Sequence, residues 1–374
     1  MLQELLVPQT APIVASPPAL PWHKVMMAWI EQPRVKWAVP IPLLLALAPL
    51  VWLFFRSTWR ELEADALAYR QRLHEQGKVD YRPMVALAIG AVILTLQEYY
   101  GGRATYDEIV RKALVAREVL HPGGFIKVGK FDELYALTWW AFTRIGGYIL
   151  PLVVWKAIFR KDSVLDFGLR TKGFLEHAWI YAMFVGVMIP TMIIVSQQPD
   201  FGTYYPFYKN ATRSWMDFLT WEAMYVGQFF ALEIFFRGWW VRACRSFGAG
   251  AIMCMVVPYC MIHYGKPYLE ACGAIVAGTV LGSLSMKTKS IYAGFLVHIT
   301  VAILMDFLAL HHRHALPHKL TPESTHEIVF RFTPHVLWSV WVFALLMMLV
   351  KLVRVWPQIR AWMERRRATT RAAG

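Results

Sequence analysis

Long hydrophobic runs separated by short polar segments dominate the chain. A helix needs about 20 apolar residues to cross the hydrocarbon core of a bilayer. Nine stretches reach or approach that length: residues 37–55, 83–100, 134–158, 175–197, 214–241, 248–264, 268–286, 290–310 and 334–354. The pattern predicts an all-α fold, a polytopic transmembrane helix bundle with about eight or nine spans.

The composition supports a membrane protein. Hydrophobic residues make up 57% of the 374 residues, charged residues make up 17%, and the mean hydropathy is +0.39. Soluble globular proteins carry roughly 25% charged residues. The 17 Trp, 16 Tyr and 22 Phe provide far more surface to bury than a disordered chain has. These numbers exclude an ordinary soluble enzyme and an intrinsically disordered chain.

The formal net charge of +14 has two readings. It is typical of nucleic-acid-binding proteins and also of membrane proteins whose basic loops orient the helices. Because the chain is rich in predicted spans, we favour the second reading and predict contact with the lipid bilayer and no nucleic-acid partner. The side that holds the Arg-rich C-terminal tail also collects more Lys and Arg, which predicts an outside N-terminus and an inside C-terminus.

Two segments outside the predicted spans have their own patterns. Thr105 and Glu108 have the spacing of a capping box, and apolar residues follow at helical spacing, which predicts an extramembrane amphipathic helix near 105–120. The stretch from His311 to His335 contains six histidines. These lack fixed metal-ligand spacing, so a solvated loop is favoured over a metal site.

Five ionisable residues lie inside predicted spans of the last third of the chain: Glu233, Arg237, His263, His298 and Asp306. A charged group in the membrane costs several kcal/mol unless it faces a partner or a cavity, so each is a candidate functional residue. Glu233 and Arg237 are four residues apart on one helical face and can form an internal ion pair. Such a pair does not explain the two histidines in neighbouring helices.

The predicted hairpin brings Glu233 and His263 to one level. Glu233 lies 15 residues before Gly248 in the turn, and His263 lies 15 residues after it. Antiparallel helices with the same rise per residue place these positions at equal height. Equal height makes contact between the two side chains feasible.

These residues, taken in order, resemble a known family. Glu233-x-x-x-Arg237-Gly238, then Tyr259 with His263 four residues later, then His298 in a later apolar helix, is similar to the motif set of the CAAX-protease and bacteriocin-processing (CPBP) family of intramembrane endopeptidases. The resemblance runs from about residue 162, including the segment 167–170, to residue 306. Residues 263–267 and 305–306 fit best a sorting-type, myxosortase-like branch.

The resemblance divides the chain into four parts. Residues 1–36 are an N-terminal extramembrane segment, and 37–160 hold the N-terminal membrane helices and the surface helix. Residues 161–310 form the CPBP-like catalytic membrane core, and 311–374 contain the His-rich loop, the last span and the basic tail. Two positions depart from the family pattern: Leu232 stands where a second glutamate is common, and Ala302 stands where Asn is common.

The resemblance implies an integral protein of a bacterial inner (cytoplasmic) membrane that cleaves the C-terminal region of membrane-associated or lipid-modified proteins. It implies Glu233, His263 and His298 as catalytic residues and Arg237 and Asp306 as supporting ones. Glu233 would activate water, His263 would hold that water, and His298 would donate to the oxyanion.

Other mechanisms and functions remain open. Glu233, His263 and His298 would also make a three-ligand Zn²⁺ site, but no cofactor is favoured because a His-Glu-x-x-His motif is missing. A noncatalytic membrane scaffold or an immunity-type homologue of the same family is the main alternative function. A transporter is less favoured because the sequence has no visible inverted repeat.

Overall fold

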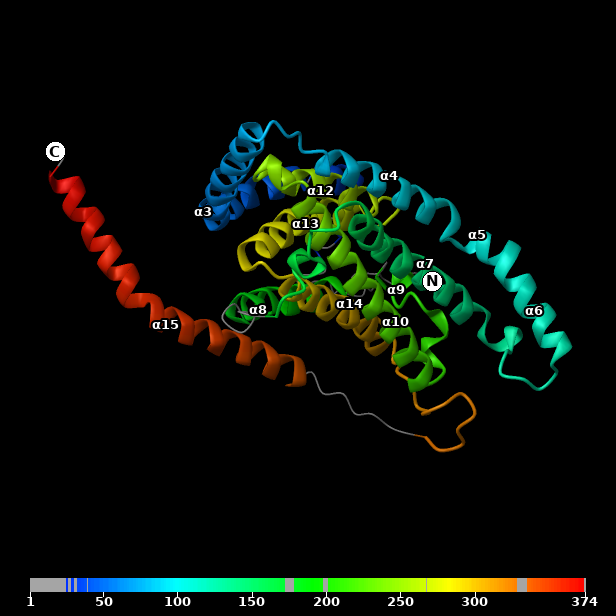
Figure 1. Ribbon diagram of the computed structural model, residues 1–374. Coiled ribbons are helices and arrows are strands. Elements are labelled where there is room, and N and C mark those ends of the chain that lie inside the picture. Colours follow the sequence, from blue (N-terminus) through cyan, green and yellow to red (C-terminus); the bar gives the residue numbers. More distant parts are fainter. Residues whose placement is uncertain are drawn as a thin grey trace, which may run out of the picture. The chain divides into compact units, whose positions relative to one another are not determined.

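Figure 1 presents the computed structural model, which describes residues 25, 28–29, 32–38, 40–171, 178–197, 201–266, 268–327 and 335–372. Within these ranges the chain is helical, and the only extended pairing is an isolated bridge between Lys319 and Glu327. The chain forms two compact units, residues 1–46 and 47–374. Most of the predicted N-terminal segment 1–36 lies outside the described residues.

The first unit contains α2 (Pro33–Ala38) and the start of α3 (Pro40–Glu75), which continues into the second unit. The second unit holds the other helices: α4 (Arg82–Tyr100), α5 (Arg103–Thr105), α6 (Arg111–Leu120), α7 (Val128–Ile158), α8 (Ala178–Val195), α9 (Phe201–Tyr204), α10 (Trp215–Glu233), α11 (Val241–Ala243), α12 (Gly250–Met261), α13 (Tyr268–Thr288), α14 (Tyr292–His312) and α15 (His335–Ala372). Short 3₁₀ turns are η2 (Val164–Phe167), η4 (Lys209–Thr212) and η6 (Arg245–Phe247), and π-helical segments are η1 (Tyr106–Val110) and η5 (Ile234–Trp240).

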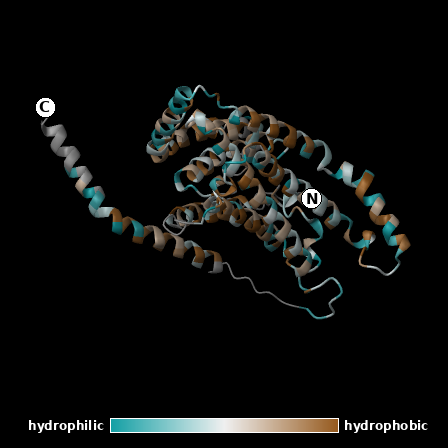
Figure 2. Cartoon of the chain, viewed as in Figure 1, coloured by the Kyte–Doolittle hydropathy of each residue, from teal (hydrophilic) through white to brown (hydrophobic). Residues whose placement is uncertain are grey.

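The prediction of a polytopic helical bundle is confirmed. In the described part of the chain, six helices are long and apolar enough to cross a membrane: Pro33–Glu75, Arg82–Tyr100, Val128–Ile158, Glu270–Thr288, Tyr292–His312 and Leu337–Gln358. Trp179–Val195 and Gly250–Met261 are shorter apolar helices. Figure 2 shows hydrophobic residues along α8 and α14 and hydrophilic residues at the connection from α3 to α4.

The fifth predicted span, 214–241, is not among these six. It is nevertheless helical, because α10 continues through η5 into α11. The helix carries Asp217, Glu222 and Glu233, and all three are buried. Its polar residues therefore face the protein interior rather than lipid.

The centre of the bundle is built around this same helix. Every residue from Ala231 to Val241 is buried, whereas a helix on a protein surface buries only one face. Its aromatic side chains pack with α4, α7 and α12 in the largest core cluster, and Trp239 is fully buried among them. The rest of the bundle thus holds the segment that contains Glu233 and Arg237 on all sides.

The predicted helix near 105–120 is present, but the prediction of a capping box at its start is wrong. Helical structure runs from Arg103 through η1 to Leu120. Gly102 is the N-cap, so Thr105 lies inside the helix, where its hydroxyl donates to the Tyr99 carbonyl at 3.2 Å instead of capping. The helix is fixed to α7 through Asp132, which accepts a hydrogen bond from Arg111 at 2.9 Å.

The His-rich stretch begins within a helix. His311 and His312 form the last turn of α14, and the chain then runs irregularly to Glu327. The His312 ring contacts the Ser196 hydroxyl at 2.9 Å. The side chain of His335 lies outside the described residues.

Candidate active site

Glu233 is the last residue of α10, where the helix widens into the π-helical segment η5. Its side chain and that of Arg237 are both 0% exposed. A π-helical segment within a longer helix costs stability and is frequent at functional sites. Here it determines how the glutamate and the arginine one turn later face each other.

Arg237 is held by charge and by an aromatic face. Its Nη1 lies 3.2 Å from Oε1 of Glu233, and its guanidinium carbon lies 3.9 Å from the ring centroid of Tyr259. Among the described residues, none of its three nitrogens has a well-aligned hydrogen-bond partner. The ion pair and the cation–π contact therefore compensate its buried charge.

His298 contacts the same carboxylate from α14. Its Nδ1 lies 2.9 Å from Oε1 of Glu233, and its Nε2 lies 3.4 Å from the Tyr259 hydroxyl. Because an ionised carboxylate only accepts hydrogen bonds, Nδ1 carries the proton. The Glu233 carboxylate thus orients the His298 ring, which is 17% exposed.

His263 reaches the site through Tyr259. Its Nδ1 donates to the Tyr259 carbonyl at 2.8 Å, and its ring lies 4.7 Å from the Tyr259 ring centroid. A contact of His263 with Glu233 is not among the contacts of the described residues. The physical reason is that α12 ends at Met261, so His263 belongs to the following turn and does not continue the helix. In the neutral ring this arrangement leaves Nε2 as an acceptor.

Gly294 allows α14 to pack closely against the second oxygen of Glu233. Oε2 of Glu233 is buried without a hydrogen-bond partner in the described part of the chain. A Cβ atom at position 294 would lie 2.8 Å from this oxygen. Glycine in the first turn of α14 therefore lets the helix backbone pack against this oxygen, where a larger residue would displace the carboxylate.

If the site cleaves peptides as the sequence resemblance implies, we expect Gly294→Ala to lower that activity by at least about tenfold, because a displaced Glu233 loses its alignment. Overpacking should also destabilise the fold by about 1–3 kcal/mol. Gly273→Ala in α13 is the matched control, since a Cβ there meets no atom within 4 Å. Equal activity and thermal stability of the two variants would contradict this account of Gly294.

Gly238, the glycine of the first motif, is required for close packing. A Cβ at this position would lie 2.5 Å from the Phe167 carbonyl oxygen in η2. The widened helix also exposes carbonyl groups, and Arg242 donates to the Arg237 carbonyl at 2.7 Å while Ser285 donates to it at 3.2 Å. Contacts from η2 and α13 thus support the π-helical shape.

Asp306 lies away from the three proposed catalytic side chains. It is eight residues beyond His298 in α14, or about 12 Å along the axis, and it accepts a hydrogen bond from Trp221 at 2.8 Å. Glu222 is buried nearby in α10, and both of its oxygens lack partners among the described residues. Asp306 therefore belongs to a second polar cluster with Trp221.

The three predicted side chains do not form a metal centre as they are arranged. Among the described residues, no group of three or more His, Cys, Asp or Glu is placed to hold a metal ion. The Nδ1 atoms of His263 and His298 are engaged by a carbonyl and by Glu233. A zinc site would need a rearrangement of these contacts, so we derive no step through a metal.

The sequence analysis assigned no role to two residues of the site. Tyr259 was part of the second motif, yet its position between Arg237, His263 and His298 follows only from the packing of α12 against η5 and α14. Gly294 had no signal, because nothing in the sequence distinguishes it from other helical glycines.

Comparison with known families supports the resemblance. Residues 214–304 match the family model described as type II CAAX prenyl endopeptidase Rce1-like. The matched segment includes Glu233, Arg237, His263 and His298 and ends two residues before Asp306. Searches of curated proteins and of solved structures gave no match. The resemblance to the CAAX-protease family is confirmed for this segment, and together with the six candidate spans it indicates an integral membrane protein.

Proposed function

We propose that this protein is an intramembrane endopeptidase that cleaves the C-terminal region of membrane-associated or lipid-modified protein substrates. The observation that carries the proposal is the contact of Glu233 with His298 at 2.9 Å inside the segment that matches the Rce1-like family. A buried carboxylate that orients an imidazole, beside a second imidazole, is an arrangement suited to activating water. A bacterial inner membrane is the proposed location.

The proposed reaction begins when the substrate admits a water molecule to Oε2 of Glu233, the oxygen that has no hydrogen-bond partner among the described residues. Oε2 takes one proton from the water while the hydroxide oxygen attacks the scissile carbonyl carbon. Oε1 keeps its hydrogen bond from Nδ1 of His298, so the pair holds its geometry during the transfer. Glu233 then returns the proton to the leaving amine nitrogen, which balances the hydrolysis.

The two histidines have different proposed tasks. Nε2 of His263 is left as an acceptor, so it can hold a hydrogen of the attacking water. Nε2 of His298 is the nitrogen of that ring not used by Glu233, and in the protonated ring it donates to the oxyanion. Removing one such donor typically costs about 10²- to 10³-fold in rate.

A noncatalytic member of the same family is the second candidate. It is favoured by Leu232 and Ala302, which replace the common second glutamate and Asn. Both side chains are buried apolar packing residues, so neither supplies a polar atom to the site. Such a protein would keep the fold and bind a partner without cleaving it.

A processing experiment tests the proposed activity. Membranes from cells with and without the protein should differ in the C-terminal peptides of a subset of membrane proteins, measured by mass spectrometry of C-termini. We expect shortened C-termini only when the intact protein is present. Identical C-termini in both membranes would favour the noncatalytic alternative.

Metal content tests the water-activation step separately. If Glu233 acts as a base without a metal, the purified protein should contain well under one zinc per chain and keep its activity after prolonged chelation. Elemental analysis and the cleavage assay measure both quantities. Stoichiometric zinc that leaves and returns together with activity would instead assign Glu233, His263 and His298 as ligands.

A further inference from the structure

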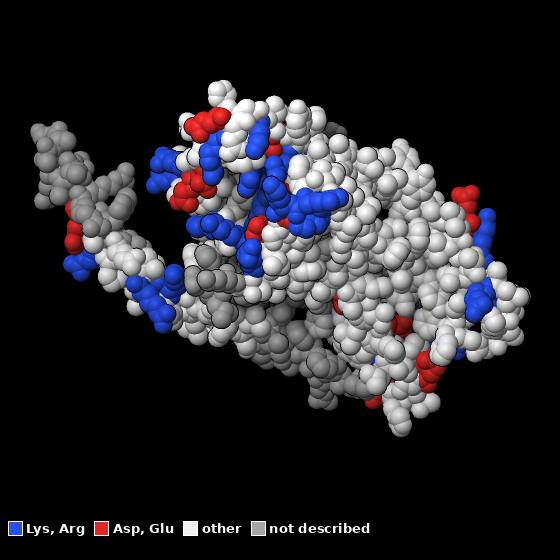
Figure 3. Space-filling model, viewed as in Figure 1, with Lys and Arg blue, Asp and Glu red and all other residues white. Residues whose placement is uncertain are grey.

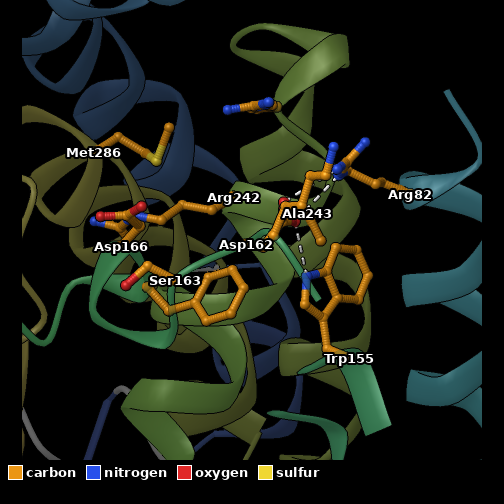
Figure 4. A pocket seen from close by; sticks show the side chains of 11 residues that line it. Arg82, Trp155, Asp162, Ser163, Asp166, Arg242, Ala243 and Met286 are labelled. Atoms are coloured by element: carbon orange, nitrogen blue, oxygen red, sulfur yellow. Dashed lines mark hydrogen bonds and ion pairs between the residues drawn. The ribbon is translucent and has the colours of Figure 1, made fainter. Parts of the chain in front are cut away.

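A polar pocket with a volume of about 240 Å³ lies outside the Glu233 site. None of Glu233, Arg237, His263 or His298 lines it. Its charged lining residues are Arg82, Lys161, Asp162, Asp166, Arg242 and Arg245. Figure 4 shows Arg82 approaching from one side and Asp166 and Met286 from the other, with Arg242 between them in the view.

The pocket lies at the level of a membrane boundary. Arg82 is the first residue of one candidate span, and Trp155 and Met286 belong to the last turns of two others. By alternation of the spans, these three ends face the side predicted to be inner. Figure 3 shows Lys and Arg gathered over the region that α3 and α12 occupy in Figure 1.

Each carboxylate of the pocket already has a guanidinium partner. Asp162 accepts from Arg82 at 3.1 Å and from the Trp155 indole at 3.1 Å. Burial raises the pKa of the Asp162 carboxyl, but these hydrogen bonds outweigh it and bring the pKa below its ordinary value. Asp166 pairs with Arg170 at 2.7 Å. The acidic residues thus leave little negative charge for other cations.

Three cations of the pocket form no direct ion pair with a carboxylate among the described residues. Within the described ranges, no Asp or Glu lies within ion-pair distance of Lys161, Arg242 or Arg245. Arg242 uses three of its five donor hydrogens on the carbonyls of residues 237, 238 and 285. Arg245 lies 4.2 Å from the ring centroid of Tyr69. The pocket therefore presents an excess of positive charge with free donors.

We propose that this pocket binds the phosphate group of an anionic phospholipid headgroup. Guanidinium and ammonium groups match phosphate oxygens in charge and hydrogen bonding. Basic pockets between helix ends on the cytoplasmic side are suited to anionic headgroups. The volume is smaller than the roughly 300–1,000 Å³ of sites for drug-sized ligands, so it admits a headgroup while the acyl chains stay in the bilayer.

The test measures binding to the purified full-length protein in a mild detergent. Thermal stability is followed while short-chain phosphatidylglycerol, short-chain phosphatidylcholine or inorganic phosphate is added, because a bound ligand raises the melting temperature by mass action. The variant is Lys161→Ala combined with Arg245→Ala, both exposed residues. The matched control, Arg72→Ala with Lys78→Ala, removes two exposed charges from the same predicted side.

We expect phosphatidylglycerol to stabilise the protein saturably and phosphatidylcholine to do so much less. The pocket variant should need at least about tenfold more phosphatidylglycerol, as loss of two charge-assisted contacts implies, and the control should behave like the unmodified protein. If inorganic phosphate stabilises the protein more strongly than the lipid does, the pocket is a site for free phosphate and the proposal of a lipid headgroup is wrong. Equal effects of the two lipids, or equal binding by the two double variants, would overturn the site itself.

Discussion

Replacing Glu233 with Gln is expected to abolish cleavage while the protein stays folded in the membrane. An amide fills nearly the volume of the carboxylate but cannot take a proton from water. Gln also accepts a hydrogen bond through its carbonyl oxygen, so the contact with Nδ1 of His298 can be kept. Loss of a catalytic base typically lowers the rate by about 10²- to 10⁴-fold, measured with a C-terminal peptide substrate in proteoliposomes.

Asp306→Asn is the matched control for this experiment. Asp306 is also fully buried in the bundle and undergoes the same carboxylate-to-amide change. Because it contacts Trp221 and not Glu233, we expect this variant to keep substantial activity. Retained cleavage by the Glu233 variant at normal expression would refute the base assignment. Equal loss in both variants would move Asp306 into the catalytic group.

The fold was predictable because the bilayer imposes one simple rule. Long apolar runs must form helices, since lipid offers no hydrogen-bond partner to the backbone. The exception is the segment 214–241, which is not among the candidate spans although every residue from 231 to 241 is buried. Glu233 belongs to a helix that is buried in protein rather than in lipid, so hydropathy alone does not predict that this helix lies at the centre of the bundle.

The candidate site residues that could be predicted from the sequence are those whose charged side chains are unfavourable inside a membrane. Glu233, Arg237 and His298 were found because each is costly in an apolar helix, and the structure brings these three into contact. Residue counting predicted that His263 would lie level with Glu233, but counting assumes an unbroken helix and α12 ends at Met261. The role of Gly294 could not be predicted from the sequence, because it depends on which side chain of another helix faces this glycine.

Arg237→Ala is expected to destabilise the fold by about 3–5 kcal/mol, the cost of leaving a buried charge without its partner. Arg237 is 0% exposed, lies 3.2 Å from Glu233 and covers the Tyr259 ring. Its removal therefore leaves both a carboxylate without its cation and a cavity. The folded yield in mild detergent and the melting temperature should fall together.

A double-mutant cycle separates the charge effect from the packing effect. If the lost ion pair dominates, Arg237→Ala should destabilise the Glu233→Gln protein much less than the unmodified protein, because no buried carboxylate then needs compensation. If packing against Tyr259 dominates, the loss should be the same in both backgrounds. Under the first account Arg237→Met, which restores much of the volume but no charge, would leave the protein with Glu233 nearly as unstable as Arg237→Ala does. Rescue of equal size in both backgrounds would show that Arg237 serves to fill space and that His298 alone suffices to hold the Glu233 carboxylate.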